Sequence, residues 1–324
     1  MKLVTDRLLP PEISQRLLEE APDLTLVSIS PQRKSRFLEE VADADIVMGS
    51  FGGGSGDLFR EIVRSARRAR WFHTSSAGVD ELFCPELIRR PEPLLTCGKG
   101  ESVATLLAEH AMALLLALTR CIVSAARKTS WQRDAFEMAP TELRSMTMGI
   151  VGFGAVGQAL ATRARAFEMS VLGIRTRPSS PPPGVEAVWG PDRLPELLRR
   201  SDVVVLTLPH TPQTVSFFGE IQFRQMKSTA LLINVGRGQV VDGKALERAL
   251  VEGWIAGAGL DVMPAEPWPV ESSLWHMDNV IITPHIAGNS PYRAARNLEQ
   301  FVANFGRFVR GEPLTSVVDR KAGY

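Results

Sequence analysis

The chain has 324 residues and a formal net charge of +1 at pH 7, with 44% hydrophobic and 23% charged residues. This balance is typical of a globular protein of two domains, and it gives no electrostatic reason to expect a nucleic acid or a membrane as partner. Three cysteines without CxxC spacing argue against a disulfide framework or zinc knuckle, and the N-terminal segment lacks an apolar signal-peptide core, so we expect a cytoplasmic protein.

The N-terminal third alternates short apolar runs with amphipathic stretches. The runs LTLVSIS, ADIVMGS and RWFHTSS predict strands, and PPEISQRLLEEA, PQRKSRFLEEVA and GDLFREIVRSARRA predict helices, which together indicate βαβ units around a parallel sheet. SFGGGSGD lacks the Lys-Ser/Thr of a P-loop, so we expect a simple loop. A long helix should follow from about Glu101 to Arg127; its run AMALLLAL is far shorter than the roughly 20 residues of a membrane span, which predicts a buried helix.

The middle of the chain repeats this alternation more strongly. Strands are expected in MGIVGFG, SVLGI, DVVVLTLP, ALLINVG, AGAGLDV and NVIITPH, and helices in VGQALATRARAF, TVSFFGEIQFRQM and DGKALERALVEG. Unbroken apolar strands such as VVVL suit a sheet covered on both faces. The cluster PSSPPPG predicts a loop inside this domain, and SPYRAARNLEQFVANFGRFVRGE predicts a final long helix that returns to the first domain.

A glycine-rich turn in MGIVGFGAVGQALATRA joins an apolar strand to an amphipathic helix. Gly152 permits the tight turn, Gly154 lets the backbone approach a pyrophosphate, and Gly157 allows close packing of the helix on the strand. With Ala155 and Val156 between them, these residues place the phosphates at the helix N-terminus. The context therefore predicts dinucleotide binding.

The segment VLGIRTRP follows this turn at about the twenty-residue distance where an acid usually holds the ribose of NAD. Arg175 occupies the candidate position and Arg177 follows closely. Both could pair with the 2′-phosphate of NADP through charge-assisted hydrogen bonds, and the hydroxyl of Thr176 could add a neutral one. The alternative is that both arginines are solvated and that NAD binds without the acid. We predict NADP as the preferred cofactor, with NAD as the alternative.

Three polar residues come just after strands of the middle domain: Arg237 in NVGRGQVVD, Glu266 in GLDVMPAEPWP and His285 in TPHIAGNS. Because ligands bind at the carboxyl ends of such strands, the three loops can converge on one crevice. An arginine matches a carboxylate, a histidine can protonate a carbonyl oxygen as hydride arrives, and a carboxylate orients the imidazole. Each residue taken singly has an ordinary structural explanation, but the three behind the glycine turn favour hydride chemistry on a 2-oxo acid.

With these motifs, the chain resembles the D-isomer-specific 2-hydroxyacid dehydrogenases, which include glyoxylate/hydroxypyruvate reductases, phosphoglycerate dehydrogenases and D-lactate dehydrogenases. The resemblance runs from SSAGVDELF through LLAEHAMALLLALTR to TPHIAGNS. It is most specific in INVGRGQVVDGKALERAL, GAGLDVMPAEP and SSLWHMDNVIITPHIAG.

The resemblance implies a role for each residue. Arg237 would bind and polarise the substrate, His285 would be the acid/base, and Glu266 would be its carboxylate partner. The substrate carboxylate would be held by the backbone amides of Ser76, Ala77 and Gly78. Asp261 would contact the nicotinamide carboxamide, and the cofactor cleft would be lined by Leu208, Pro209 and Val235.

The resemblance also implies two Rossmann-like domains. A doubly wound parallel-sheet cofactor domain, residues 101–290, would be inserted in a smaller flavodoxin-like substrate domain, residues 1–100 plus 291–324. The family further implies a homodimer built largely on the cofactor domain.

We therefore predict an oxidoreductase that reduces a small 2-oxo acid, of the glyoxylate or hydroxypyruvate type, to the (R)-2-hydroxy acid by hydride transfer from NAD(P)H. No metal is expected, because His73 and His110 show no ligand spacing with the cysteines. The alternative is a non-catalytic, NAD(H)-sensing binding protein of the corepressor type, which can retain the same three polar residues.

Overall fold

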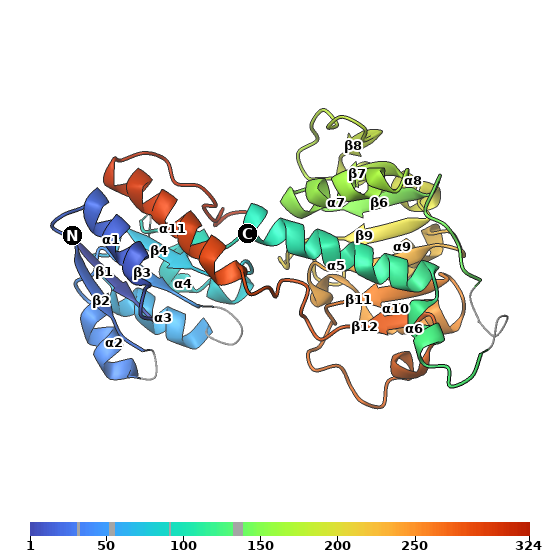
Figure 1. The fold of residues 1–324 in the computed structure, drawn as a ribbon, viewed down its shortest axis with the longest axis horizontal. Helices are drawn as coiled ribbons and strands as arrows, with labels where there is room; N and C mark the ends of the chain where they lie inside the picture. The colour runs from blue at the N-terminus through green and yellow to red at the C-terminus, as the bar shows by residue number, and fades with distance from the viewer. Residues whose placement is uncertain (31–32, 52–55, 91, 132–138) are drawn as a thin grey trace. The chain divides into compact units, whose positions relative to one another are not determined.

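The computed structural model describes the 324 residues except 31–32, 52–55, 91 and 132–138 and, within a helix, the side chains of 101–102 (Figure 1). The chain divides into two compact units, Met1–Val103 with Ser290–Tyr324 (unit 1) and Ala104–Asn289 (unit 2). Each unit has its own all-parallel sheet flanked by helices, so the predicted α/β fold class is confirmed. Four residues of the expected loop SFGGGSGD, 52–55, lie outside the described residues.

Unit 1 is built on a five-stranded sheet in the order β2-β1-β3-β4-β5, the doubly wound order of flavodoxin-like folds. Its strands are β1 (Lys2–Thr5), β2 (Thr25–Ser28), β3 (Ile46–Gly49), β4 (Trp71–Thr74) and β5 (Leu94–Cys97). Its helices are α1 (Pro11–Glu20), α2 (Lys34–Val41), α3 (Gly56–Ser65), η1 (Asp80–Leu82), α4 (Pro85–Ile88) and α11 (Arg293–Val309). Helices α1 and α11 cover one face of this sheet and α2 and α3 the other (Figure 1), each over its own apolar core.

Unit 2 is built on a seven-stranded sheet in the order β12-β11-β10-β9-β6-β7-β8. Its strands are β6 (Thr147–Val151), β7 (Ser170–Ile174), β8 (Ala187–Trp189), β9 (Val203–Leu206), β10 (Leu231–Asn234), β11 (Gly257–Leu260) and β12 (Val280–Ile282). Its helices are α5 (Glu101–Thr119), which begins in unit 1, α6 (Ile122–Ala126), α7 (Ala155–Ala166), η2 (Pro191–Arg193), α8 (Leu194–Arg200), α9 (Glu220–Gln225), η3 (Gly238–Val240), α10 (Gly243–Val251) and η4 (Ser273–His276). The chain order reverses between β6 and β9, so their carboxyl ends form the switch point where such sheets bind ligands.

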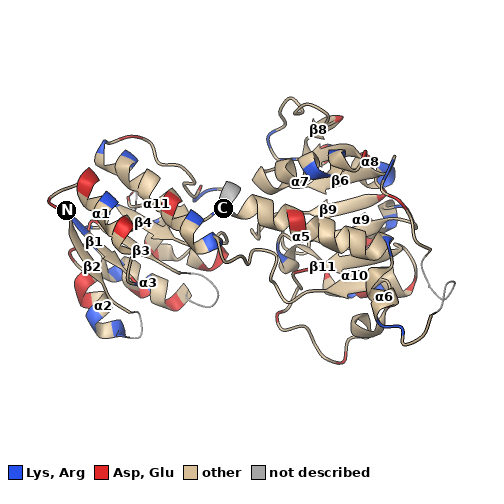
Figure 2. Ribbon diagram, viewed as in Figure 1, with Lys and Arg blue, Asp and Glu red and all other residues tan. Residues whose placement is uncertain are grey.

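Both faces of the unit 2 sheet are buried, as the apolar strands predict. Helices α5 and α7 pack on one face, and α8, α9 and α10 on the other. Charged residues of both signs are interspersed over the helices and loops, whereas the strands are largely uncharged (Figure 2). No described helix is long and apolar enough to cross a membrane.

The structure corrects several expected elements. The sequence analysis did not predict the strands β1 (KLVT), β5 (LLTC) and β8 (AVW). The long helix from Glu101 ends at Thr119, because the amide of Thr141 donates to the Thr119 carbonyl at 2.8 Å and Cys121 is left-handed at φ 51°. TVSFFGEIQFRQM becomes helical only at α9, because Phe218 pairs with Val241 as an isolated bridge. Tertiary pairing overrides the local pattern at both places.

Candidate active site

The glycine-rich turn lies between β6 and α7. Gly152 has a φ of +105°, and a Cβ there would lie 2.9 Å from Thr207 Oγ1, so this position requires glycine. A Cβ at Gly157 would lie 3.1 Å from both the Gly152 carbonyl oxygen and Ile150 Cγ2, so α7 packs closely on the turn and on β6. Two of the three glycines therefore shape the backbone as the motif predicts.

Gly154 serves a different purpose, because a Cβ there would meet nothing within 4 Å. Open space beside this backbone is what the approach of a ligand needs. Gly154 is also the N-cap of the twelve-residue helix α7, without a side-chain cap hydrogen bond, and Ala155, Val156 and Gly157 form the first turn. The positive end of the helix dipole and the amides of this turn suit an anion, so these residues fit the pyrophosphate of a dinucleotide.

Arg175 lies directly beside this turn. The amides of Gly152 and Phe153 both donate to the carbonyl of Ile174, the last residue of β7, at 3.0 and 2.7 Å. Arg175 follows Ile174 with its side chain partly exposed, and its Nη1 donates to Ser179 Oγ at 3.4 Å.

Thr176 and Arg177 continue the chain as exposed residues, and PSSPPPG is a loop that leads to β8, as expected. The three residues of the segment RTR therefore lie at the same sheet edge as the phosphate turn, on the side of β7.

The chain after β9 closes the other side of the turn. Thr207 Oγ1 donates to the Gly152 carbonyl at 2.6 Å, and the partly buried Leu208 and Pro209 follow. A Cβ at Gly236 would lie 2.8 Å from the Leu208 carbonyl oxygen, and the neighbouring Val235 is 2% exposed. The carboxyl ends of β9 and β10 thus meet next to the glycine turn.

His285 and Glu266 form a pair 19 residues apart in sequence. His285 Nδ1 lies 2.8 Å from Glu266 Oε2, and the side chains are 51% and 38% exposed. Glu266 Oε1 accepts a hydrogen bond from the Met263 amide at 3.1 Å, which fixes the carboxylate. Because Nδ1 faces this carboxylate and donates to it, Nε2 remains as the nitrogen that can exchange a proton with a ligand.

Arg237 comes from the neighbouring loop after β10. The buried Asn234 shapes this loop, because its Nδ2 donates to the Arg237 carbonyl at 3.2 Å and its Oδ1 accepts from the Gly236 amide at 3.1 Å. A Cβ at Gly238 would lie 1.8 Å from the carbonyl oxygen of Met263. The loop that carries Arg237 therefore packs directly on the loop that leads to Glu266.

Asp261 lies inside unit 2, with its side chain 1% exposed. Its Oδ1 accepts from Thr283 Oγ1 at 2.6 Å and from the Ile286 amide at 2.9 Å, and its Oδ2 accepts from the Ala287 amide at 3.0 Å. His110 Nε2 lies 3.3 Å from Asp261 Oδ1. The contact of Asp261 with a nicotinamide stays a prediction. The sequence analysis did not assign His110 and Thr283 to this site, and the only signal was a histidine, next to Glu109, just before the apolar run of the helix.

Ser76, Ala77 and Gly78 belong to unit 1, just after β4. The Ser76 amide donates to Thr74 Oγ1 at 3.2 Å, and the Ser76 carbonyl accepts from the Gly98 amide at 2.9 Å. These bonds hold the segment at the carboxyl end of the unit 1 sheet.

Comparison with known proteins points to one family. The family model "D-isomer specific 2-hydroxyacid dehydrogenase, NAD binding domain" matches residues 112–287. A glyoxylate reductase from Pyrococcus furiosus is 38% identical over 298 residues, 89% of this chain and 86% of that protein. One from Korarchaeum cryptofilum is 35% identical over 322 residues, 96% of this chain and 94% of that protein.

Solved structures agree over the whole chain. The NADPH-dependent glyoxylate/hydroxypyruvate reductase from Sinorhizobium meliloti, in complex with NADP and sulfate, has a TM-score of 0.79 at 28% identity and covers 100% of this chain and 99% of its own. A probable 2-hydroxyacid dehydrogenase from Rhizobium etli, in complex with NADP, HEPES and L(+)-tartaric acid, has a TM-score of 0.79 at 26% identity with the same coverage.

Proposed function

Because the chain belongs to the D-isomer specific 2-hydroxyacid dehydrogenase family, we propose that it reduces a small 2-oxo acid of the glyoxylate or hydroxypyruvate type to the (R)-2-hydroxy acid with NADPH. It is an NAD(P)-dependent dehydrogenase, and its relatives favour this enzyme over an NAD(H)-sensing binding protein. The observation that carries the proposal is the 2.8 Å His285–Glu266 pair, in the same unit as a glycine turn that fits a pyrophosphate.

His285 is the proposed proton donor. When bound, the reduced nicotinamide supplies the hydride that adds to the carbonyl carbon of the 2-oxo acid. The protonated imidazole of His285 gives its Nε2 proton to the carbonyl oxygen, which becomes the hydroxyl. Glu266 holds Nδ1 at 2.8 Å and stabilises the positive charge of the imidazolium before the transfer.

Arg237 is the proposed substrate anchor. Its guanidinium offers a planar fork of N–H donors that matches a carboxylate, and the same charge polarises the neighbouring carbonyl. We also assign the amides of Ser76, Ala77 and Gly78 to the substrate carboxylate, and so unit 1 to substrate binding and unit 2 to the nucleotide. The support for this assignment is the resemblance in sequence together with the position of the segment at the end of β4.

The preference for NADP rests on Arg175, Thr176 and Arg177. The main-chain contact of the turn with Ile174 brings this segment beside the site that fits the pyrophosphate. Two cations suit a 2′-phosphate, and an NAD site would use a carboxylate at the position of Arg175. Structural relatives described with NADP support this choice.

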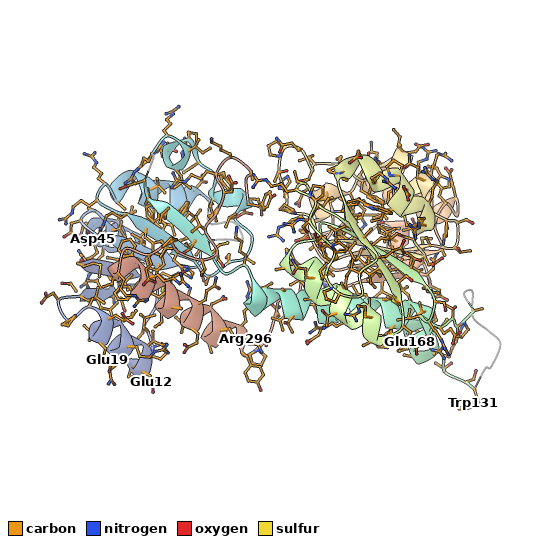
Figure 3. The ribbon with its side chains drawn as sticks, turned by 90° about the horizontal axis from the view of Figure 1, so that it is seen from above. Glu12, Glu19, Asp45, Trp131, Glu168 and Arg296 are labelled. Atoms are coloured by element: carbon orange, nitrogen blue, oxygen red, sulfur yellow. The ribbon has the colours of Figure 1, made fainter. Side chains whose placement is uncertain are left out.

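A homodimer and a cytoplasmic location complete the proposal. Ile122 and Trp131 are 54% and 93% exposed near the end of the α5–α6 region, and Trp131 lies at the outer edge of unit 2 (Figure 3). The homodimer itself rests on the resemblance in sequence, and sedimentation of the pure protein should then give twice the chain mass. The cysteines Cys84, Cys97 and Cys121 are free and buried, which fits a reducing compartment.

The test is a matrix of 2-oxo acids assayed with NADH and with NADPH. Wild type should reduce glyoxylate or hydroxypyruvate, and kcat/KM should fall by about 10²–10⁴ in Arg237→Ala and in His285→Ala. His276→Ala, at the end of η4, is the matched control and should retain wild-type turnover. Unchanged turnover in either site variant would refute the mechanism.

A further inference from the structure

We propose that His110 is a positioning residue for proton transfer at His285, acting through Thr283 and Asp261. The inference rests on the proposed function of His285 but concerns a residue on another element, helix α5. His110 touches neither the pair His285–Glu266 nor the glycine turn in any contact described above; it contacts the residues that hold the backbone around His285.

His285 needs such support because its backbone is left-handed, with a φ of 54°. A residue with a Cβ adopts this conformation only when its surroundings impose it. The His285 amide donates to the carbonyls of Asp261 and Thr283 at 2.8 and 3.0 Å. The next two amides, of Ile286 and Ala287, donate to the two oxygens of the Asp261 carboxylate. One buried carboxylate therefore sets the turn that presents the imidazole.

The hydrogen bonds around Asp261 define what His110 contributes. Thr283 Oγ1 gives its proton to Asp261 Oδ1 at 2.6 Å, so the hydroxyl can only accept from its other neighbour. That neighbour is His110 Nε2, at 2.8 Å from Thr283 Oγ1 and 3.3 Å from Asp261 Oδ1. Nε2 of His110 therefore carries a hydrogen and donates to this network, and it orients the Thr283 hydroxyl toward the carboxylate.

The position of His110 follows from close packing of α5 on the sheet. A Cβ at Gly259, in β11, would lie 2.9 Å from Leu114 Cβ, so the glycine allows α5 to approach the strand. His110 lies one helical turn before Leu114, and Asp261 lies two residues after Gly259. The same packing therefore brings the imidazole of His110, 19% exposed, to the 1% exposed carboxylate of Asp261.

Two substitutions separate the donor from the shape. His110→Leu replaces the imidazole with an apolar side chain that has no donor, and His110→Gln keeps an N–H donor. We expect kcat for the 2-oxo acid to fall about tenfold in the leucine variant, the effect of losing one hydrogen bond to a charged network, and to stay within about threefold of wild type in the glutamine variant. The dissociation constant of NADPH should stay within about twofold in both. His276→Leu is the matched control.

Hydrogen exchange gives a readout that does not require turnover. In a peptide that covers residues 283–288, the amides of Ile286 and Ala287 should exchange about tenfold faster in His110→Leu than in wild type or in His110→Gln. Thermal unfolding of each variant shows whether the whole unit is still folded.

Faster exchange and lower kcat confined to His110→Leu support the inference. Equal behaviour of the leucine and glutamine variants, whether both are like wild type or both are impaired, overturns it. If wild type reduces no 2-oxo acid, the proposed function fails, and the exchange rates still decide whether His110 holds the loop of His285.

Discussion

Charge reversal at Arg175 is the sharpest test of cofactor choice. Arg175→Asp places a carboxylate directly after β7, beside the turn whose amides bond the Ile174 carbonyl. The side chain is partly exposed and its hydrogen bond to Ser179 Oγ is long at 3.4 Å, so the substitution should leave the fold intact.

The expected magnitude follows from this exposure. A charge-assisted hydrogen bond contributes about 1.5–3 kcal/mol, and partial exposure favours the lower end for Arg175 and a 2′-phosphate. A carboxylate about 4 Å from the phosphate adds about 1 kcal/mol of repulsion in water. Together these effects lower kcat/KM for NADPH about 60-fold. The new acceptor for the ribose hydroxyls raises kcat/KM for NADH by up to about tenfold.

The assay compares kcat/KM for NADPH and NADH in wild type and in Arg175→Asp, at about 0.1 M and at about 1 M salt. The switch in preference should be several hundredfold at low salt and smaller at high salt, where the Debye length is about 3 Å. Arg199→Asp is the matched control. This substitution changes the net charge equally, at an exposed residue near the end of α8. The neighbouring residue, Arg200, pairs with Glu186, which comes directly before β8. A wild type that prefers NADH, or equal effects of the two variants, would refute the reasoning.

Further predictions concern the turn and the stability of unit 1. Gly154→Ala should change the free energy of unfolding by less than about 0.5 kcal/mol, because the added Cβ meets nothing within 4 Å. The same Cβ fills the open space beside the turn, so the variant should bind NADPH more weakly in a fluorescence titration. Binding as tight as in wild type would contradict this prediction. Gly152→Ala should lower the free energy of urea unfolding by about 1–3 kcal/mol, because of its φ of +105° and the contact with Thr207. Arg90→Lys should cost about 1–3 kcal/mol, since one guanidinium donates to four carbonyls at and beyond the end of α3; a loss below about 0.5 kcal/mol would argue against this capping. Burial lowers the pKa of His73 from 6.5 to about 3, so its neutral form favours folding above pH 6.5 and this stability is lost as the pH falls from 6.5 toward 3. The free energy of urea unfolding, measured at several pH values, should therefore depend less on pH in His73→Leu than in wild type. An unchanged pH dependence would count against the buried neutral ring.

The amino-acid sequence by itself determined the α/β class and the glycine turn. Both depend on local patterns, namely the switch between strand and helix periodicity and the spacing of Gly152, Gly154 and Gly157. It also indicated that Arg237, Glu266 and His285 come from neighbouring loops, because the carboxyl ends of parallel strands share one edge. The pairing of His285 with Glu266 follows that rule, and the catalytic roles of these residues stay predictions.

Only the tertiary structure decided which distant groups meet. The strands β1, β5 and β8 were not identified from their own patterns, and each pairs with neighbouring strands in its sheet. The end of α5 at Thr119 depends on a bond from Thr141. The support of His285 by His110 depends on a contact between residues 173 positions apart in sequence, His110 and Thr283, which exists only because α5 packs against Gly259. Local preferences act over a few residues, whereas such contacts are set by the packing of whole elements, so no single segment of the sequence encodes them.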